Sequence, residues 1–122
     1  MAKISVTIEQ VLTKENINDI VGTALEGGIN YWCRQAIVKD VPAKAEGHYN
    51  YASDVISLGG TLELYDAESS DKWDLTLEKL LNGVQIHCTK TGTTPLELMD
   101  NFDATDADCI IQYAVMGELV FG

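Results

Sequence analysis

The stretch from Tyr31 to Arg34 brings together two aromatic rings, a thiol and the only arginine of the chain. Aromatic faces stack on flat ligands, and a guanidinium binds phosphate groups. Tyr31, Trp32 and Arg34 therefore indicate a pocket for a small molecule, such as a nucleotide signal. In an extended strand, however, Tyr31 and Cys33 would share one face and Trp32 the other, so that one face would belong to the core. Phosphate recognition also usually takes several cations, which weakens this interpretation.

Cysteine and histidine side chains could supply a nucleophile and its base. The three cysteines, Cys33, Cys88 and Cys109, form an odd set inside apolar runs, which is typical of buried, reduced thiols. His87 and Cys88 would point to opposite faces of a strand, so we expect a buried Cys88 and a surface His87. The chain also lacks CxxC, HxxxH, P-loop, GxGxxG and GxSxG motifs. We therefore expect no enzyme, no metal and no cofactor, and a thiol-dependent enzyme is the least supported alternative.

Carboxylates give the strongest compositional signal, with 19 Asp and Glu against 8 Lys and Arg, a net charge of −11. Residues 1–60 carry a net charge of −2 and residues 61–122 a net charge of −9. Such a field repels nucleic acid and favours basic partners, so we predict an acidic binding surface and no direct nucleic-acid binding. The simpler alternative is a solvated surface that keeps the protein soluble. The predicted surface has two exposed clusters: Asp66, Glu68, Asp71 and Asp74 in a hairpin, and Glu97, Asp100 and Asp103 in a loop.

Periodic apolar residues predict the elements that hold these side chains in a single domain over residues 1–122. Alternation predicts a strand over residues 3–8, and Thr13 is placed to cap a helix with an apolar stripe from Ile17 to Leu25. TLELYD and KWDLT predict a hairpin, and Thr76 should cap the following helix, LEKLLN. Thr105 and Asp108 have the spacing of a capping box at the start of the last helix. Residues 40–51 and 88–104 are the expected long loops.

Glycines follow helix-like runs and precede strand-like runs at four places: TALEGGINYWC, VISLGGTLELY, KLLNGVQIHC and YAVMGELVF. The pattern predicts helices that each end in a glycine cap and lead into a strand. The resulting order is β-α-β-α-β-β-α-β-α-β. We therefore predict an α+β fold with a mainly antiparallel or mixed sheet and three to four short helices. The predicted cap and turn residues are Gly27, Gly28, Gly59, Gly60, Gly83 and Gly117.

Four stretches together carry a resemblance to known proteins: TALEGGINYWC, YASDVISLGGTLELYDAE, LTLEKLLNGV and CIIQYAVMGELVFG. Through them the chain resembles small, mostly uncharacterised acidic proteins of phages and prophages of gut Firmicutes. It implies an accessory protein that acts by binding, as a stoichiometric inhibitor of a bacterial defence system of the anti-CRISPR or anti-restriction kind. The expected partner is a basic surface of a host defence protein. The resemblance supplies no site residue.

The expected location is the cytoplasm of the host bacterial cell. The segment MAKISVTIEQ lacks the apolar region of a signal peptide, and no run of about 20 apolar residues could span a membrane. We therefore expect no membrane partner. Whether the chain forms a homodimer stays open.

Overall fold

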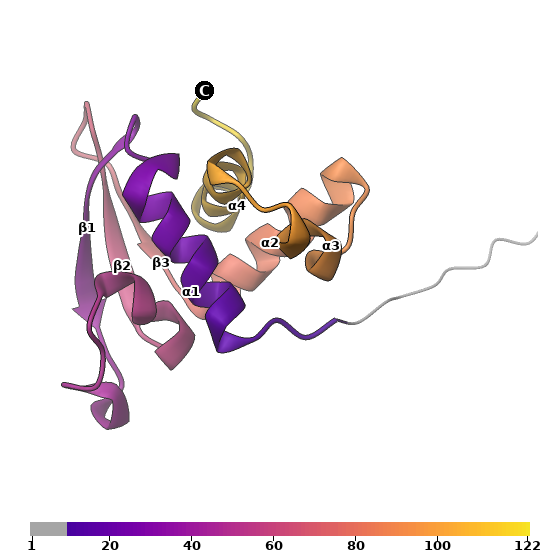
Figure 1. The fold of residues 1–122 in the computed structure, drawn as a ribbon. Helices are drawn as coiled ribbons and strands as arrows, with labels where there is room; N and C mark the ends of the chain where they lie inside the picture. The colour runs from indigo at the N-terminus through magenta and orange to yellow at the C-terminus, as the bar shows by residue number, and fades with distance from the viewer. Residues whose placement is uncertain (1–9) are drawn as a thin grey trace, which may run out of the picture.

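The computed structural model describes residues 10–122 and has an α+β fold, as predicted (Figure 1). The predicted strand over residues 3–8 lies outside the described residues. The helices are α1 (Lys14–Thr23), α2 (Leu77–Thr91), α3 (Pro95–Asp100) and α4 (Ala104–Met116). The strands are β1 (Cys33–Asp40), β2 (Thr61–Asp66) and β3 (Lys72–Leu75). A π-helical turn (Ala24–Gly28) extends α1, and short 3-10 turns cover Ala43–Ala45, Ala52–Asp54 and Ile56–Leu58.

The three strands form one antiparallel sheet in the order β1-β2-β3. The helices lie on one side of this sheet and leave its other face open (Figure 1). Strand β2 alternates accordingly: Leu62 and Leu64 are buried under the helices, whereas Glu63 and Tyr65 are partly exposed on the open face. The predicted hairpin is thus confirmed as β2 and β3, with Leu64 opposite Trp73.

The core lies between the sheet and the helices. Helix α1 contributes the predicted stripe, in which Ile17, Ile20 and Val21 are buried, and α4 contributes Ile110 and Ile111. These residues meet the inward-facing leucines of the sheet, so one apolar layer joins every strand to α1, α2 and α4. Burial of each such side chain contributes roughly 1.5–3 kcal/mol.

Side-chain caps fix where the helices begin. Thr13 caps α1 in a capping box with Asn16, and Thr76 caps α2, both as predicted. The predicted cap of α4, Thr105, is wrong by two residues. Asp103 caps this helix, and its carboxylate accepts a hydrogen bond from the Asp106 amide while Asp106 bonds back to the Asp103 amide. A carboxylate is favoured over a threonine at this cap, because it also interacts favourably with the helix dipole.

Two predicted strands are absent from the described part of the chain. Residues 83–88 continue α2 to Thr91, because Leu80, Val84, His87 and Cys88 form a buried face at helical spacing. Residues 118–121 have no strand partner within residues 10–122 and run as an irregular segment after α4. Part of the predicted loop over residues 88–104 is helical, since Thr94 and Pro95 begin α3.

The predicted glycine cap is present at two of the four places, Gly59 and Gly117, but only Gly59 also leads into a strand, β2. Gly59 and Gly117 end helical turns with φ values of 91° and 77°, in the left-handed region that favours glycine. Gly27 and Gly28 lack positive φ and lie in the π-helical turn. Gly83 sits inside α2 where a Cβ would lie 2.4 Å from the Ile110 carbonyl oxygen. Its role is close approach of α2 to α4, not capping.

Candidate functional site

Tyr31 and Trp32 lie in the turn before β1 and both bind one carboxylate of α4. The Tyr31 hydroxyl donates to Asp108 Oδ2 at 2.5 Å, and the Trp32 indole N–H donates to Asp108 Oδ1 at 2.8 Å. The predicted strand alternation is therefore wrong at these two residues, because β1 begins only at Cys33. Trp32 is only 2% exposed. Other residues of the same chain surround the Trp32 ring, so it has no open face on which a ligand could stack.

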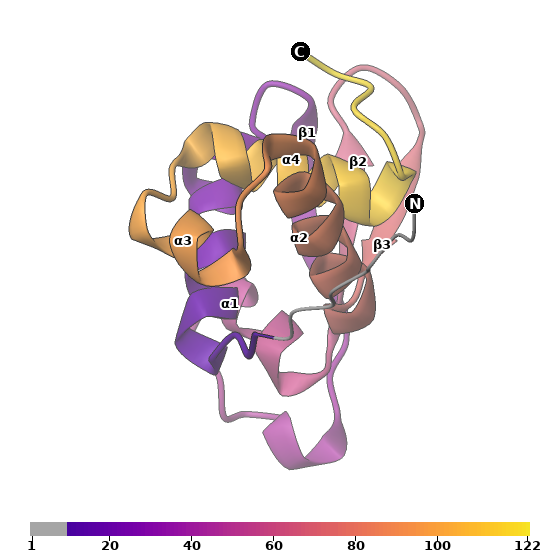
Figure 2. The same ribbon diagram turned by 90° about the vertical axis from the view of Figure 1, so that its right-hand side faces the viewer.

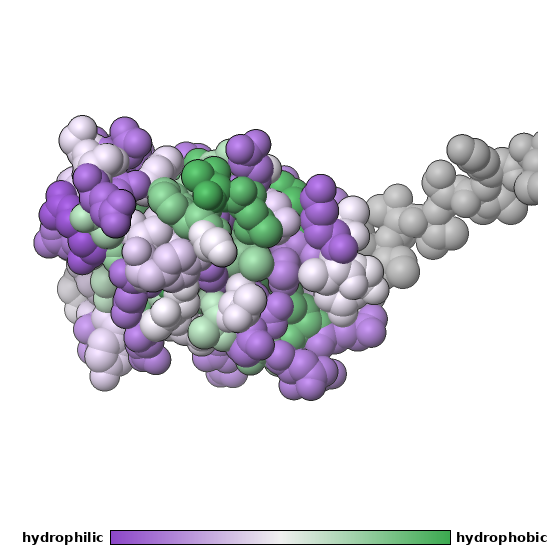
Figure 3. All heavy atoms as spheres, turned by 90° about the horizontal axis from the view of Figure 1, so that it is seen from above, coloured by the Kyte–Doolittle hydropathy of each residue, from purple (hydrophilic) through white to green (hydrophobic). Residues whose placement is uncertain are grey.

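The last residues of the chain cover Trp32. Phe121 stacks on Trp32 with ring centroids 5.1 Å apart and meets Trp73 edge-on at 6.2 Å. Gln112 of α4 is 1% exposed, and its Oε1 accepts hydrogen bonds from the Val120 and Phe121 amides at 2.8 Å. Figure 3 shows apolar surface over this end of the molecule, where Val120 is 55% exposed.

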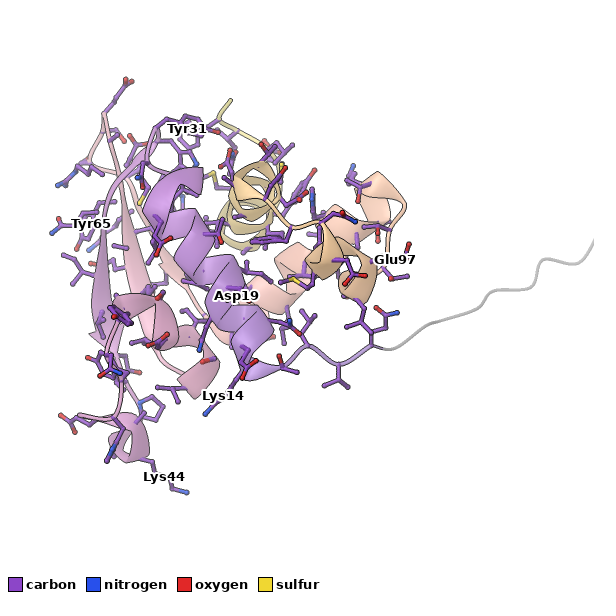
Figure 4. The ribbon with its side chains drawn as sticks, viewed as in Figure 1. Lys14, Asp19, Tyr31, Lys44, Tyr65 and Glu97 are labelled. Carbon is purple, nitrogen blue, oxygen red and sulfur yellow. The ribbon has the colours of Figure 1, made fainter. Side chains whose placement is uncertain are left out.

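Arg34 points elsewhere, so the structure does not bring the predicted pocket together. Its Nε donates to the Asp66 carbonyl oxygen at 3.1 Å, and its guanidinium lies over the Tyr65 ring at 5.2 Å. Figure 4 shows Tyr65 on the open side of the sheet and Tyr31 near α4. A small depression of about 240 Å³ includes Arg34 and Cys33 in its lining but neither Tyr31 nor Trp32.

The environment of Tyr31 makes its protonation a test of this cluster. Burial of the hydroxyl, its hydrogen bond to Asp108 and that carboxylate's charge raise the pKa of Tyr31 to about 12. Because the folded pKa exceeds the ordinary value of 10.0, the stability contribution is complete below pH 10 and is lost as the pH rises towards 12. Urea unfolding should therefore show a steeper stability loss between pH 10 and 12 in the wild type than in Tyr31→Phe. Equal slopes would contradict the assigned hydrogen bond.

Two of the four hairpin acids are less accessible to a partner than predicted, because one is buried and one is paired with a lysine. Asp66 is buried, at 7% exposure, and its Oδ1 orders the turn by accepting hydrogen bonds from the Glu68 and Ser69 amides. This corrects its assignment to an exposed cluster, because an aspartate at this position satisfies turn amides. Asp74 is paired with Lys39 at 2.9 Å. Glu68 and Asp71 are the exposed acids of this turn.

The second acidic cluster, Glu97, Asp100 and Asp103, is exposed on α3 and at the start of α4. Glu97 accepts a hydrogen bond from the Thr94 hydroxyl at 2.9 Å, and Asp103 caps α4. Figures 1 and 2 show α3 and the turn between β2 and β3 on opposite sides of the molecule. The two predicted clusters therefore do not form one continuous surface.

A larger depression lies next to this second cluster, and we call it the acidic groove. It has a volume of about 480 Å³. Asp19 and Glu26 line it from α1 and its π-helical extension, Asp54 from the turn Ala52–Asp54, and Phe102 from the loop before α4. Figure 4 shows Asp19 midway along α1. The full lining is Asn18, Asp19, Gly22, Thr23, Glu26, Ser53, Asp54, Met99 and Phe102.

The acidic groove has no basic side chain in the part of its lining that the structure describes. Among residues 10–122, its lining contains no lysine, arginine or histidine. Within residues 10–122, the carboxylates of Asp19, Glu26 and Asp54 make neither an ion pair nor a side-chain hydrogen bond. Asp100 and Asp103 follow Met99 and Phe102 directly in the chain, so they bring further negative charge to its edge. The arrangement suits a cationic side chain whose hydrocarbon part or guanidinium face contacts Phe102.

The sequence prediction missed these groove acids, although one signal for them was present. Asp19, Gly22, Thr23 and Glu26 follow the spacing i, i+3, i+4, i+7, which is one face of a helix. That face is polar and carries small residues between two acids. Asp54 and Phe102 come from distant segments and carry no local sign of their role.

The thiols and the histidine occupy protected positions. Cys33 and Cys88 are buried and Cys109 is partly buried. Burial raises the pKa of all three thiols, with the charge of Asp106 adding at Cys88 and that of Asp108 at Cys109. His87 is also buried, which corrects the expected surface position: it lies on a helix, with its Nε2 2.9 Å from Asp106 Oδ1.

Thiol labelling checks these surroundings. We expect Cys109 to react first with a thiol reagent at pH 8, and more slowly than free cysteine, because the thiolate is the reactive form and its pKa is raised. Cys33 and Cys88 should react only as the protein opens. Labelling of either buried thiol at the rate of free cysteine, followed by mass spectrometry of the peptides, would contradict this order.

Residues 10–122 contain no group of three or more His, Cys, Asp or Glu side chains placed to hold a metal ion. In the same part of the chain, every helix is too short or too polar to cross a bilayer. Comparisons with models of known protein families, with curated proteins and with solved structures gave no match.

Proposed function

We propose that this protein is an accessory protein of a phage or prophage that inhibits a host defence protein by binding it stoichiometrically. The acidic groove is the centre of the contact, and Glu97, Asp100 and Asp103 extend it. The observation that carries the proposal is a groove lined by Asp19, Glu26 and Asp54 in which the described lining residues include no basic side chain. The phage context comes from the sequence resemblance described above.

The proposed partner surface is rich in lysine and arginine, as is the nucleic-acid-binding surface of a nuclease. A carboxylate facing a cation at an exposed site contributes roughly 0.2–1 kcal/mol, and more where the contact excludes water. Three such contacts near the upper end of this range would account for tenfold or greater tightening, since tenfold corresponds to about 1.4 kcal/mol. Inhibition then follows because the occupied cations are no longer available to nucleic acid.

Recovery of the tagged protein from a host lysate tests the proposal. We expect the wild type to retain a basic protein in near-stoichiometric amount and to release it as salt rises, since screening shortens to about 8 Å at physiological ionic strength. A variant with Asp19→Asn, Glu26→Gln and Asp54→Asn should retain at least about tenfold less.

The matched control removes three exposed acids outside the groove, with Glu46→Gln, Glu68→Gln and Glu118→Gln. Both variants have the same net charge, so the control should keep wild-type retention if the groove is the contact. Equal loss in both would mean that net charge alone attracts the partner. The function is then checked by phage plating on a strain whose defence system blocks that phage: the wild type and the control should restore plating, and the groove variant should not.

A further inference from the structure

The segment after α4 is held as a bound peptide would be held. Beyond Gly117, which has a φ of 77°, residues 118–122 make no hydrogen bond to the sheet. Their described hydrogen bonds go to one side chain, Gln112, and the ring of Phe121 packs against two tryptophans, stacked on Trp32 and edge-on to Trp73. Leu119 and Val120 are 49% and 55% exposed, so they add little burial.

Gln112 binds the backbone of the segment, which makes this contact independent of side-chain identity. Its Oε1 accepts from the Val120 and Phe121 amides at 2.8 Å, and its Nε2 lies 3.3 Å from the Phe121 carbonyl oxygen. A buried amide that pairs with two successive N–H groups and a carbonyl of another segment can recognise the backbone of a peptide in the same conformation. Specificity then comes from the ring of Phe121.

The walls around that ring are fixed by contacts that do not involve the segment. Asp108 holds the Trp32 indole N–H at 2.8 Å and the Gln112 amide at 2.8 Å. Trp73 stands on β3 and meets Trp32 edge-on at 5.6 Å. We define the aromatic slot as Trp32, Trp73 and Gln112. These contacts come from α4, the turn before β1 and β3, and none of them uses Phe121.

We infer that the aromatic slot is a recognition site for a peptide segment of a partner protein that inserts a phenylalanine ring. Residues 118–122 are its occupant in this structure and act as a latch that such a peptide displaces. The occupant's chemistry is taken from the segment seated there, Val120 followed by Phe121 and a glycine. This inference does not depend on the acidic groove.

The latch and an external peptide compete for the aromatic slot. The latch is tethered next to the slot, so its effective concentration is high and the apparent affinity for an external peptide falls by the fraction of molecules in which the latch is open. Removal of the Phe121 ring should therefore raise the affinity for an external peptide without adding any contact.

The test uses the full chain and a fluorescein-labelled peptide, GELVFG, which repeats residues 117–122. We expect saturable binding to Phe121→Ala that is at least about tenfold tighter than binding to the wild type. The peptide GELVAG should not bind, and Leu119→Ala, which changes an exposed side chain of the latch, should behave as the wild type does. Absence of saturable binding to folded Phe121→Ala would overturn the inference.

A second measurement needs no variant. Hydrogen exchange of the wild type should show the Val120 and Phe121 amides exchanging at least tenfold faster than the Ile111 amide in the core of α4, because the latch opens without unfolding. Equal protection of these amides would overturn the latch. Light scattering of the wild type at high concentration should show a monomer. A dimer that is lost in Phe121→Ala would overturn the assignment to a partner protein, since the occupant would then be a second copy of this chain.

Discussion

Gly83→Ala is expected to destabilise the protein by about 2 kcal/mol. The added Cβ would lie 2.4 Å from the Ile110 carbonyl oxygen and 3.0 Å from the Ala114 amide nitrogen, and both are backbone atoms of α4. A backbone cannot rotate away as a side chain can, so α2 and α4 must move apart. Overpacking of this kind costs about 3 kcal/mol, and the better helix propensity of alanine returns roughly 1 kcal/mol. Urea unfolding measures the difference.

Gly27→Ala is the matched control for this change. Gly27 also lies in a helical turn and lacks positive φ, and no atom of the described residues lies within 4 Å of an added Cβ. The same substitution should therefore be neutral or stabilise the protein by up to roughly 1 kcal/mol. If both variants lost equal stability, the close approach of α2 and α4 would not be the reason for glycine at position 83.

Gln112→Ala is expected to cost about 2–4 kcal/mol. The change removes the acceptor for the Val120 and Phe121 amides and a donor to Asp108, all at 2.8 Å, from a side chain that is 1% exposed. It also frees the segment that covers Trp32, so tryptophan emission should shift to longer wavelength. Gln85→Ala, at an exposed position of α2, should leave both quantities unchanged. A stability loss below about 0.5 kcal/mol in Gln112→Ala would contradict the role of Gln112.

Local patterns predicted the elements whose signals lie within a few residues. Thr13 and the stripe from Ile17 define α1, and the polar stretch between TLELYD and KWDLT defines the hairpin. The strand prediction for residues 83–88 is wrong because the apolar residues of this segment fit both the strand period and the helix period. The sequence pattern predicts a cap at Gly83, whereas this glycine lies inside α2 and permits close contact with α4. Only the position of α4 distinguishes these roles.

The candidate site was less predictable because it depends on which segments meet. The role of Asp66 is local, because its carboxylate binds the amides of residues two and three positions later. The known preference of aspartate for such turns could have predicted it. The polar face of α1 at Asp19 and Glu26 is visible in the sequence, but nothing local places Asp54 or Phe102 opposite it. The irregular segment likewise depends on Trp32 and Trp73, which lie 41 positions apart in the chain. Tertiary packing creates both features.

An NMR titration with an arginine-containing peptide tests the proposed binding surface most directly. The probe is acetyl-GRGRG-amide, added to the ¹⁵N-labelled protein at low and at physiological salt. We predict saturable amide shifts concentrated at Asp19, Gly22, Thr23, Glu26 and Asp54, weakened by salt and absent from the variant with Asp19→Asn, Glu26→Gln and Asp54→Asn. Shifts that centre on Glu68 and Asp71, or that spread evenly over all exposed acids without saturating, would contradict the acidic groove as the centre of binding.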